Sequence, residues 1–190
     1  MDQAHCLRTE AHRLLYEEGL FSLVSTVGPA AVVGSYAFDL MTWPDLDINV
    51  HLPHEKDIAA FFDLGGRIAT GFQVMKLTFS NQFIRPDVPF DHGLYAGIRL
   101  LLGDREWKID LWGYGEVAFR SHMKAFEELQ SRLEAADRLT ILRIKDDVCR
   151  RPGYRFEVSS VDVYEAVANN HVRTVAEFDE WLCARVVAVK

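Results

Sequence analysis

Cysteine is scarce in this sequence of 190 residues. The three cysteines, Cys6, Cys149 and Cys183, lie far apart and form no Cys-x-x-Cys or mixed Cys/His pattern. A disulfide framework or a structural zinc site requires clustered cysteines at regular spacing, so neither is indicated. We expect free thiols in a reducing cytoplasm.

Long apolar runs are also missing. No stretch approaches the ~20 apolar residues that a membrane-spanning helix needs. The first amphipathic segment carries charge at Arg13, Glu17 and Glu18, which is wrong for a signal peptide or a membrane anchor. We therefore expect a cytoplasmic protein that has no membrane partner.

The third absence is an excess of basic residues. Lys and Arg number 21 against 28 Asp and Glu, and the formal net charge is -7. Dedicated nucleic-acid binders normally present a basic face that neutralises phosphates, so the overall charge argues against that class. A local basic cluster is nevertheless present in the second half, made of Arg143, Lys145, Arg150, Arg151 and Arg155.

Histidines in metal-binding spacing are absent as well. The seven histidines form no HExxH or comparable motif. We expect four of them to be surface or hydrogen-bonded structural residues: His51, His54, His92 and His122.

What the sequence does contain is enough apolar residues, 49%, to bury a sizeable core. Apolar periodicity and turn residues predict the following elements. Helices are expected at 3–18, 55–69, 117–135, 137–150, 160–169 and 174–185, with a helical turn within 36–42. Strands are expected at 30–34, 45–52, 72–80, 93–102 and 107–112, with a loop around Pro86 and Pro89 and a tight turn at Gly103 and Asp104.

The pattern changes from mixed helix and strand to all-helical near residue 115. We therefore expect an α/β (α+β) core at 1–115, with a mixed, partly antiparallel sheet and flanking helices, followed by a helical region at 116–190. Because no flexible linker separates the two parts, the second is expected to pack on the first.

The strand 45–52 has one strictly polar face. Successive strand residues point to opposite sides, so Asp45 and Asp47 present two carboxylates side by side. Two like charges at this spacing repel, and a divalent cation is the commonest way to stabilise them. Taken alone, the same pair also fits a loop cap or a solvent-facing pair.

Asp110 is the best candidate for a third carboxylate. It lies within an apolar strand between Ile109 and Leu111, where an unpaired carboxylate would be costly. If this strand pairs with that of Asp47, the three carboxylates suit a two-metal site for phosphoryl transfer. Asp110 would then hold the second metal and help to deprotonate the attacking hydroxyl.

Gly34 and Ser35 end an apolar strand nine residues before Asp45. Glycine allows the backbone to approach a phosphate, and the serine hydroxyl and following amides can donate hydrogen bonds to it. A Gly-Ser pair is weak evidence by itself, but its combination with the three aspartates is specific.

These residues resemble the signature of the DNA-polymerase-β-like nucleotidyltransferase superfamily: an apolar residue, Gly, Gly or Ser, a short gap, and then Asp-apolar-Asp-apolar. The resemblance covers mainly 30–52 and 107–112, and the helical remainder looks like the tails of bacterial members of unassigned function. One departure concerns Asn49, because a metal pair formed by Asp47 and residue 49 would lack one carboxylate. The spacing from Ser35 favours Asp45 and Asp47.

The resemblance implies a set of ligands and roles. Asp45, Asp47 and Asp110 would bind Mg²⁺, as two ions, and Gly34 and Ser35 would contact the triphosphate of a nucleotide, with ATP as the expected one. Lys145 is a further candidate for phosphate contact, since helical lysines of related enzymes often reach the triphosphate. Its alternative is a solvated or snorkelling lysine. Lys76 and Lys108 lie on polar strand faces, and no spacing selects either of them.

Two functions follow as hypotheses. The first is a metal-dependent nucleotidyltransferase that transfers a nucleoside monophosphate to a hydroxyl or similar acceptor and releases pyrophosphate. The second is a nucleotide-binding or regulatory protein of the same fold without efficient chemistry. A small molecule or a protein is a better expected acceptor than RNA, because the chain is acidic. A homo-oligomer through the helical region is compatible with the sequence, and no function is assigned to Trp43, Trp107, Trp112 or Trp181.

Overall fold

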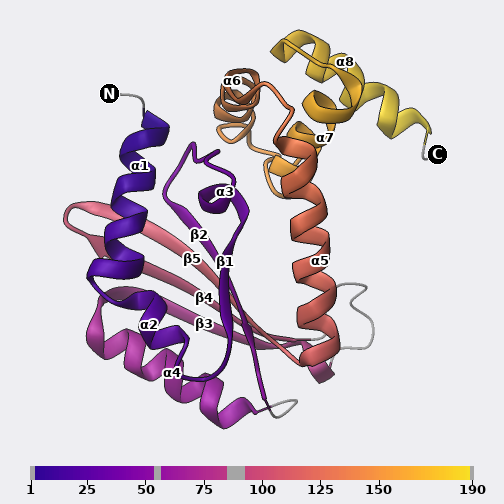
Figure 1. The fold of residues 1–190 in the computed structure, drawn as a ribbon. Helices are drawn as coiled ribbons and strands as arrows, with labels where there is room; N and C mark the ends of the chain where they lie inside the picture. Colours follow the sequence, from indigo (N-terminus) through magenta and orange to yellow (C-terminus); the bar gives the residue numbers. More distant parts are fainter. Residues whose placement is uncertain (1–2, 54–56, 85–92, 189–190) are drawn as a thin grey trace. The chain divides into compact units, whose positions relative to one another are not determined.

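The first part of the chain is built on a five-stranded sheet (Figure 1). The structure is a computed structural model, and it describes residues 3–53, 57–84 and 93–188. In order across the sheet, the strands are β1 (Ala30–Val33), β2 (Asp45–His51), β5 (Arg105–Tyr114), β4 (Gly93–Leu102) and β3 (Gln73–Asn81). The pair β2–β5 is parallel and the other three pairs are antiparallel, as expected for a mixed, partly antiparallel sheet.

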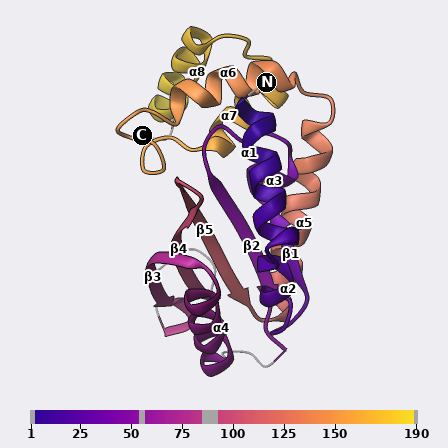
Figure 2. The same ribbon diagram turned by 90° about the vertical axis from the view of Figure 1, so that its left-hand side faces the viewer.

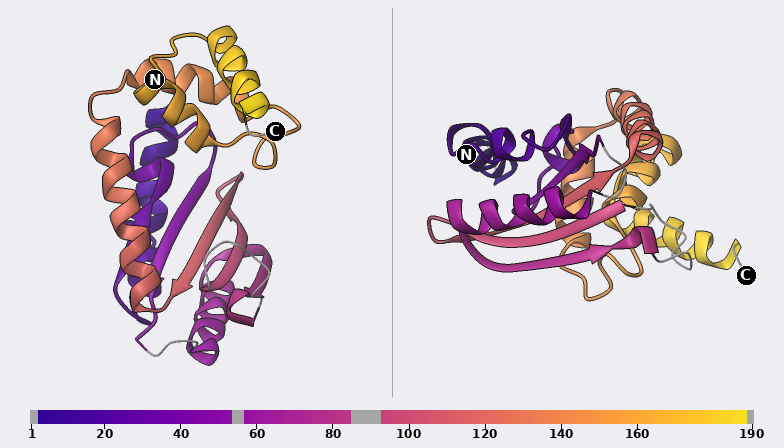
Figure 3. Two further views of the ribbon diagram at one scale, coloured as in Figure 1. Left: turned by 90° about the vertical axis from the view of Figure 1, so that its right-hand side faces the viewer. Right: turned by 90° about the horizontal axis from the view of Figure 1, so that it is seen from below.

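Alternation along β2 divides the sheet into an apolar and a polar face. Leu46, Ile48 and Val50 are fully buried, whereas Asp45 and Asp47, on the other face, are only half-buried. Strands β4 and β5 contribute their apolar residues to the same face, so β2 and β5 share one core. The two strands lie side by side, as Figure 2 shows from one side and Figure 3 from the other.

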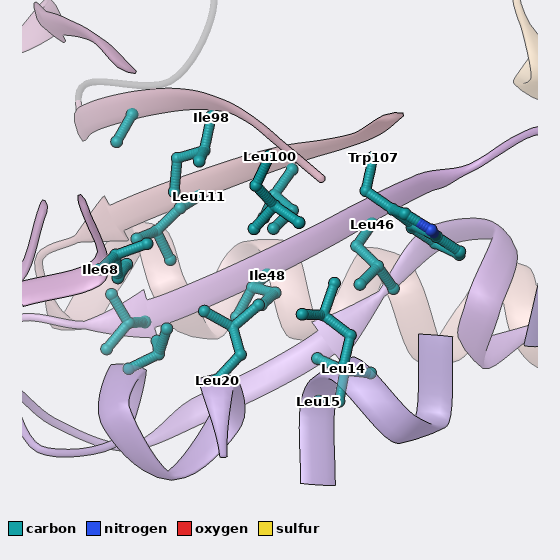
Figure 4. Close-up of a cluster of buried hydrophobic side chains, with 14 of the residues drawn as sticks. Leu14, Leu15, Leu20, Leu46, Ile48, Ile68, Ile98, Leu100, Trp107 and Leu111 are labelled. Atoms are coloured by element: carbon teal, nitrogen blue, oxygen red, sulfur yellow. The ribbon is translucent and has the colours of Figure 1, made fainter. Parts of the chain in front are cut away.

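Helices from two separate segments cover the apolar face. They are α1 (Gln3–His12), which continues as a π-helical turn at Arg13–Glu17, then α2 (Leu20–Val24) and α4 (Ile58–Gly71). Figure 4 shows Leu14, Leu20 and Ile68 from these segments against Ile48 of β2 and Leu111 of β5. This packing fixes which face of the sheet is left for polar residues.

The chain divides into two compact units, Met1–Phe126 and Glu127–Lys190. Helix α5 (Glu116–Leu133) begins in the first unit and ends in the second, which also contains α6 (Arg138–Val148), α7 (Ser160–Asn170) and α8 (Val175–Ala188). Within the second unit, α6, α7 and α8 contact one another pairwise. The expected boundary at 115 and the packing of the helical region on the core stay predictions.

Most expected elements are present within a few residues of their predicted bounds. The differences lie near the N-terminus and in α4. Helix α2 was not expected, and the short helix α3 (Gly34–Ala37) begins before the expected helical turn. The apolar residues at helical spacing in 58–68 predict one buried side of α4: Phe61, Leu64 and Ile68 are buried, but Ile58 and Phe62 are exposed.

Several expectations fall outside the described residues. These are the loop around Pro86 and Pro89 and the structural roles of His54 and His92. In the part of the chain that is described, no helix is long and apolar enough to cross a membrane. Cys6, Cys149 and Cys183 are free thiols.

Candidate functional site

The three predicted aspartates come together on the polar face of the sheet. In the parallel pair β2–β5, Asp47 lies opposite Asp110, and Asp45 lies opposite Lys108. Partners in adjacent strands are ~5 Å apart and project to the same side. The register therefore places three carboxylates from two strands next to one another, as required for Asp110 to act with the β2 pair.

A lysine lies between two of these carboxylates. The ammonium of Lys108 donates to Oδ1 of Asp45 at 3.1 Å and to Oδ2 of Asp110 at close range. Its side chain and that of Asp110 are almost fully buried. Charges removed from water are stabilised only when they are paired and hydrogen-bonded, and here each carboxylate receives a bond from the same ammonium.

The second oxygen of Asp110 is also bound. The hydroxyl of Tyr95, on β4, donates to Oδ1 of Asp110 at 2.7 Å. Asp110 is thus held from both sides, by Tyr95 and Lys108, which fixes the orientation of its carboxylate.

Sequence reasoning singled out neither Lys108 nor Tyr95. The signal for Lys108 was available, because residues two apart on a strand share a face and Lys108 precedes Asp110 by two. Tyr95 could be found only from the β4–β5 register, which pairs Tyr95 with Trp112 and Gly97 with Asp110.

Gly34 lies directly against the carboxylate of Asp47. Its φ is +67°, and a Cβ placed on it would clash with Oδ2 of Asp47. Both the backbone conformation and the lack of space therefore require glycine. Ser35, the next residue, is nearly buried at the start of α3.

Tyr36 follows in the same short helix. Its hydroxyl lies 3.2 Å from Nδ1 of His12. Burial, the largest cause, raises the pKa of Tyr36, so this hydroxyl keeps its proton at neutral pH.

The donor chemistry of the site suits a divalent cation. Carboxylate oxygens are the ligands that Mg²⁺ prefers, and Asp45 and Asp110 already share a cationic group, the ammonium of Lys108. Among the described residues, however, no three carboxylate, imidazole or thiol side chains form a group that could hold a metal ion. The carboxylates of Asp45, Asp47 and Asp110 are the residue type that binds Mg²⁺, and the ammonium of Lys108 lies among them.

Aromatic side chains continue the polar face beyond Asp110. Trp112, two residues further along β5, stacks with Tyr114 at 5.7 Å and contacts Tyr95 at 4.8 Å between ring centroids. Tyr114 in turn stacks on His122 of α5 at 4.3 Å. Trp107 is different, because it is fully buried in the apolar core.

Asn49 lies one step further along β2, opposite Trp112 rather than opposite a carboxylate. Position 49 itself therefore has no acidic partner opposite it on β5, whereas Asp47 has Asp110. Asp45 and Asp47 as the metal-binding pair stay a prediction.

Lys145 belongs to α6 of the second unit, whereas the three aspartates belong to the first. Only 1% of the residue is exposed, and its ammonium lies 5.6 Å from the centre of the Tyr164 ring. The alternative of a solvated or snorkelling lysine is wrong. Its contact with a triphosphate stays a prediction.

The basic cluster around Lys145 is partly neutralised within the second unit. Arg150 pairs with Asp146 at 2.6 Å, and Arg151 pairs with both Asp147 and Asp179 at 2.5 Å. Bonding to Asp179, the largest cause, raises the pKa of Arg151 further, so its charge is permanent but already compensated.

No protein-family profile and no curated protein matches the sequence. Solved structures do match in fold. The non-canonical poly(A) polymerase complex GLD-2–GLD-3 aligns with a TM-score of 0.51 and 15% identity, over 86% of this chain and 57% of that one. The GLD-2/RNP-8 complex aligns with a TM-score of 0.50 and 14% identity, over 82% and 56%.

The fold expected from the motif is thereby confirmed. The chain has the α/β fold of nucleotidyltransferase structures, with a five-stranded mixed sheet and C-terminal helices. It spans a little over half the length of the solved chains it matches, 56% and 57%. At this low identity, the comparison concerns the fold alone.

Proposed function

We propose that this protein transfers a nucleoside monophosphate from a magnesium-bound nucleoside triphosphate, with ATP as the expected donor, to a hydroxyl or similar acceptor. The observation that carries the proposal is the strand register that sets Asp110 opposite Asp47, beside Asp45, with the backbone of Gly34 against Asp47. The nucleotidyltransferase fold supports it.

Each of the predicted site residues has a proposed role. Asp45, Asp47 and Asp110 would hold magnesium, which when bound supplies stabilisation of the phosphate charge. Gly34 lets the backbone approach the phosphates, and Ser35 donates hydrogen bonds to them. Lys145 is proposed as a further cationic contact to the triphosphate.

Asp110 accepts the proton of the acceptor hydroxyl. The acceptor oxygen forms a bond to the α-phosphorus, the bond between that phosphorus and the oxygen leading to the β-phosphate breaks, and pyrophosphate leaves with the bonding electrons. A carboxylate has about four lone-pair sites, so Asp110 can accept from the hydroxyl while Tyr95 and Lys108 stay bound.

We propose a small molecule or a protein as the acceptor. The solved neighbours include a poly(A) polymerase complex, so an RNA 3′ hydroxyl belongs in any acceptor screen. The net charge of -7 and the ion pairs made by Arg150 and Arg151 weigh against RNA. Association of the chain with itself stays a prediction.

One observation favours a second candidate function, nucleotide binding without efficient transfer. Lys108 binds Asp110, the proposed proton acceptor, and also binds Asp45. The ammonium thus occupies an oxygen of the carboxylate that would have to accept the proton of the acceptor. A regulatory nucleotide-binding protein would tolerate this arrangement.

The first test is calorimetric titration with a non-hydrolysable ATP analogue, in magnesium and in chelator. The wild type is compared with an Asp45→Asn, Asp47→Asn double variant. An Asp63→Asn, Asp104→Asn double variant is the matched control, because it removes the same charge from exposed positions on α4 and on the β4–β5 turn. Magnesium-dependent binding that only the site variant loses supports the proposal.

Failure of the wild type to bind ATP, GTP, CTP or UTP analogues would remove both candidate functions. Where binding is found, a pyrophosphate-release assay across small-molecule, protein and RNA acceptors separates them. Release with any acceptor supports the transferase, and binding without release in the whole screen supports the regulatory protein.

A further inference from the structure

The side chain of Lys108 links the two strands that carry the carboxylates. It lies on β5 opposite Asp45, and its ammonium reaches both Asp45 and Asp110. Only 6% of the residue is exposed. A positive charge is therefore fixed between the carboxylates at a point shielded from water.

Charge balance shows what this does to cation binding. Before the triphosphate is counted, three carboxylates carry a formal charge of −3 and the ammonium of Lys108 reduces it to −2, so the side chains attract a second cation less than three carboxylates alone would. In a two-metal site, one ion is shared between the carboxylates of both strands. The ammonium of Lys108 already lies between Asp45 on one strand and Asp110 on the other.

We infer that Lys108 takes the place of the second metal, so that this site accepts one divalent cation, on Asp45 and Asp47, in place of two, and Asp110 is bound by the ammonium of Lys108 instead of by a metal. The inference rests on the proposed metal–nucleotide site. In this arrangement the ammonium of Lys108 is a permanent cation of the site that positions Asp110. Lys108 is not part of the sequence motif.

The surroundings of Lys108 favour its staying in place. Its ammonium lies 5.7 Å from the centre of the Trp43 ring, within reach of a cation–π interaction. The oxygen of Asp110 that it does not bind is held by Tyr95. A metal that displaced the ammonium would have to break both carboxylate bonds and leave a buried charge without its partners.

The test is a count of bound Mn²⁺ by electron paramagnetic resonance. Mn²⁺ uses the same oxygen ligands as Mg²⁺ and is directly visible. In the presence of a saturating non-hydrolysable ATP analogue, the wild type should bind one Mn²⁺ per chain. Lys108→Met should bind two, and the second site should disappear in a Lys108→Met, Asp110→Asn double variant.

Two control variants isolate the effect of the ammonium. Lys108→Arg keeps a cation between the carboxylates and should still bind one Mn²⁺. Lys76→Met makes the same substitution at an exposed position of β3 and should also leave one. If Lys108→Met does not fold, Lys108→Gln, which keeps a donor to the carboxylates, serves for the same count.

A second readout is the rise in unfolding temperature when Mn²⁺ is added, because a ligand stabilises the folded state according to its occupancy. The rise should be larger for Lys108→Met than for the wild type. Two Mn²⁺ in the wild type, or one in both the wild type and the neutral variants, overturns the inference alone. Absence of any Mn²⁺–nucleotide binding to the wild type overturns the proposed function too.

Discussion

Asp47 on β2 and Asp110 on β5 are direct partners in a parallel strand pair, although α4, β3 and β4 separate them in the sequence. The buried neighbours of Asp110, Ile109 and Leu111, fix this register, because a shift by one residue would turn Asp110 into the core. The same packing that stabilises the sheet therefore sets the spacing of the carboxylates.

The first prediction concerns Asp110. Asp110→Asn should keep magnesium-dependent binding of the ATP analogue, because the single inferred cation lies on Asp45 and Asp47, which are unchanged. Pyrophosphate release should fall by about 10²-fold or more, the usual effect of losing a general base. Titration calorimetry and a release assay with an active acceptor measure the two effects separately.

Equal loss of binding and turnover in Asp110→Asn would show that Asp110 acts in nucleotide binding rather than in the transfer step. The Asp104→Asn variant, at an exposed position of the neighbouring turn, should leave both quantities unchanged.

The second prediction tests whether Tyr95 positions the carboxylate of Asp110 or only stabilises the fold. Tyr95→Phe removes the hydroxyl that donates to Asp110 and keeps the ring that contacts Trp112. Loss of one hydrogen bond to a charged group costs about 1.5–3 kcal/mol. If this bond orients Asp110 in the transition state, the cost raises the barrier and turnover should fall about 10- to 100-fold. The KM for the nucleotide should change little.

Steady-state kinetics and thermal unfolding check this prediction together. A purely structural role for Tyr95 would lower the unfolding temperature and leave the turnover of the folded enzyme unchanged. A matched control is Tyr16→Phe, since Tyr16 is exposed and lies outside the sheet.

The sequence was sufficient to predict the sheet and its polar face. Strict alternation from Asp45 to Leu52 predicted β2 with the correct buried residues, and the Gly103–Asp104 turn predicted the β4–β5 hairpin. Both signals are local, because each depends on a period of two or on a turn type. The pairing of β2 with β5 was assumed rather than predicted, since sequence periodicity does not show which strands pair.

The partners of the aspartates could not be predicted in the same way. Tyr95 reaches Asp110 across a strand pair, and its contact depends on the β4–β5 register rather than on spacing in the sequence. Helix α2 was missed because its five residues are too few for an apolar period to be visible. The burial of Lys145 was missed because lysine is rarely buried.

The third prediction is a pH dependence at the start of α6, the helix that contains Lys145. Asp137 caps this helix by accepting from the backbone amides of Leu139 and Thr140 and from the Thr140 hydroxyl at 2.8 Å. The Thr140 hydroxyl bond, the largest cause, lowers the pKa of Asp137 below its ordinary value of 3.8. A lowered pKa contributes stability above the ordinary value and loses it as the pH falls through the native one.

Asp137→Asn is the variant that tests this cap. Asparagine can still cap the helix but does not titrate. The difference in unfolding temperature between the wild type and Asp137→Asn should be constant above about pH 5 and should shrink as the pH falls below about 4. A difference that is the same at both ends of this range would show that the charged form of Asp137 adds nothing to the cap.

The last prediction uses two glycines with almost the same backbone conformation. Gly34 has φ +67° and Gly103 has φ +61°, so alanine at either position should cost about 1–2 kcal/mol of stability from left-handed backbone strain. Only at Gly34 would the added methyl group also clash with Asp47, whereas no atom lies within 4 Å of it at Gly103.

Gly34→Ala should therefore weaken magnesium-dependent binding of the ATP analogue by about tenfold or more, which is at least about 1.4 kcal/mol. Gly103→Ala should leave binding unchanged. Denaturant unfolding and titration calorimetry on both variants give the two effects, and equal binding by both would mean that the close approach of Gly34 to Asp47 has no part in holding the nucleotide.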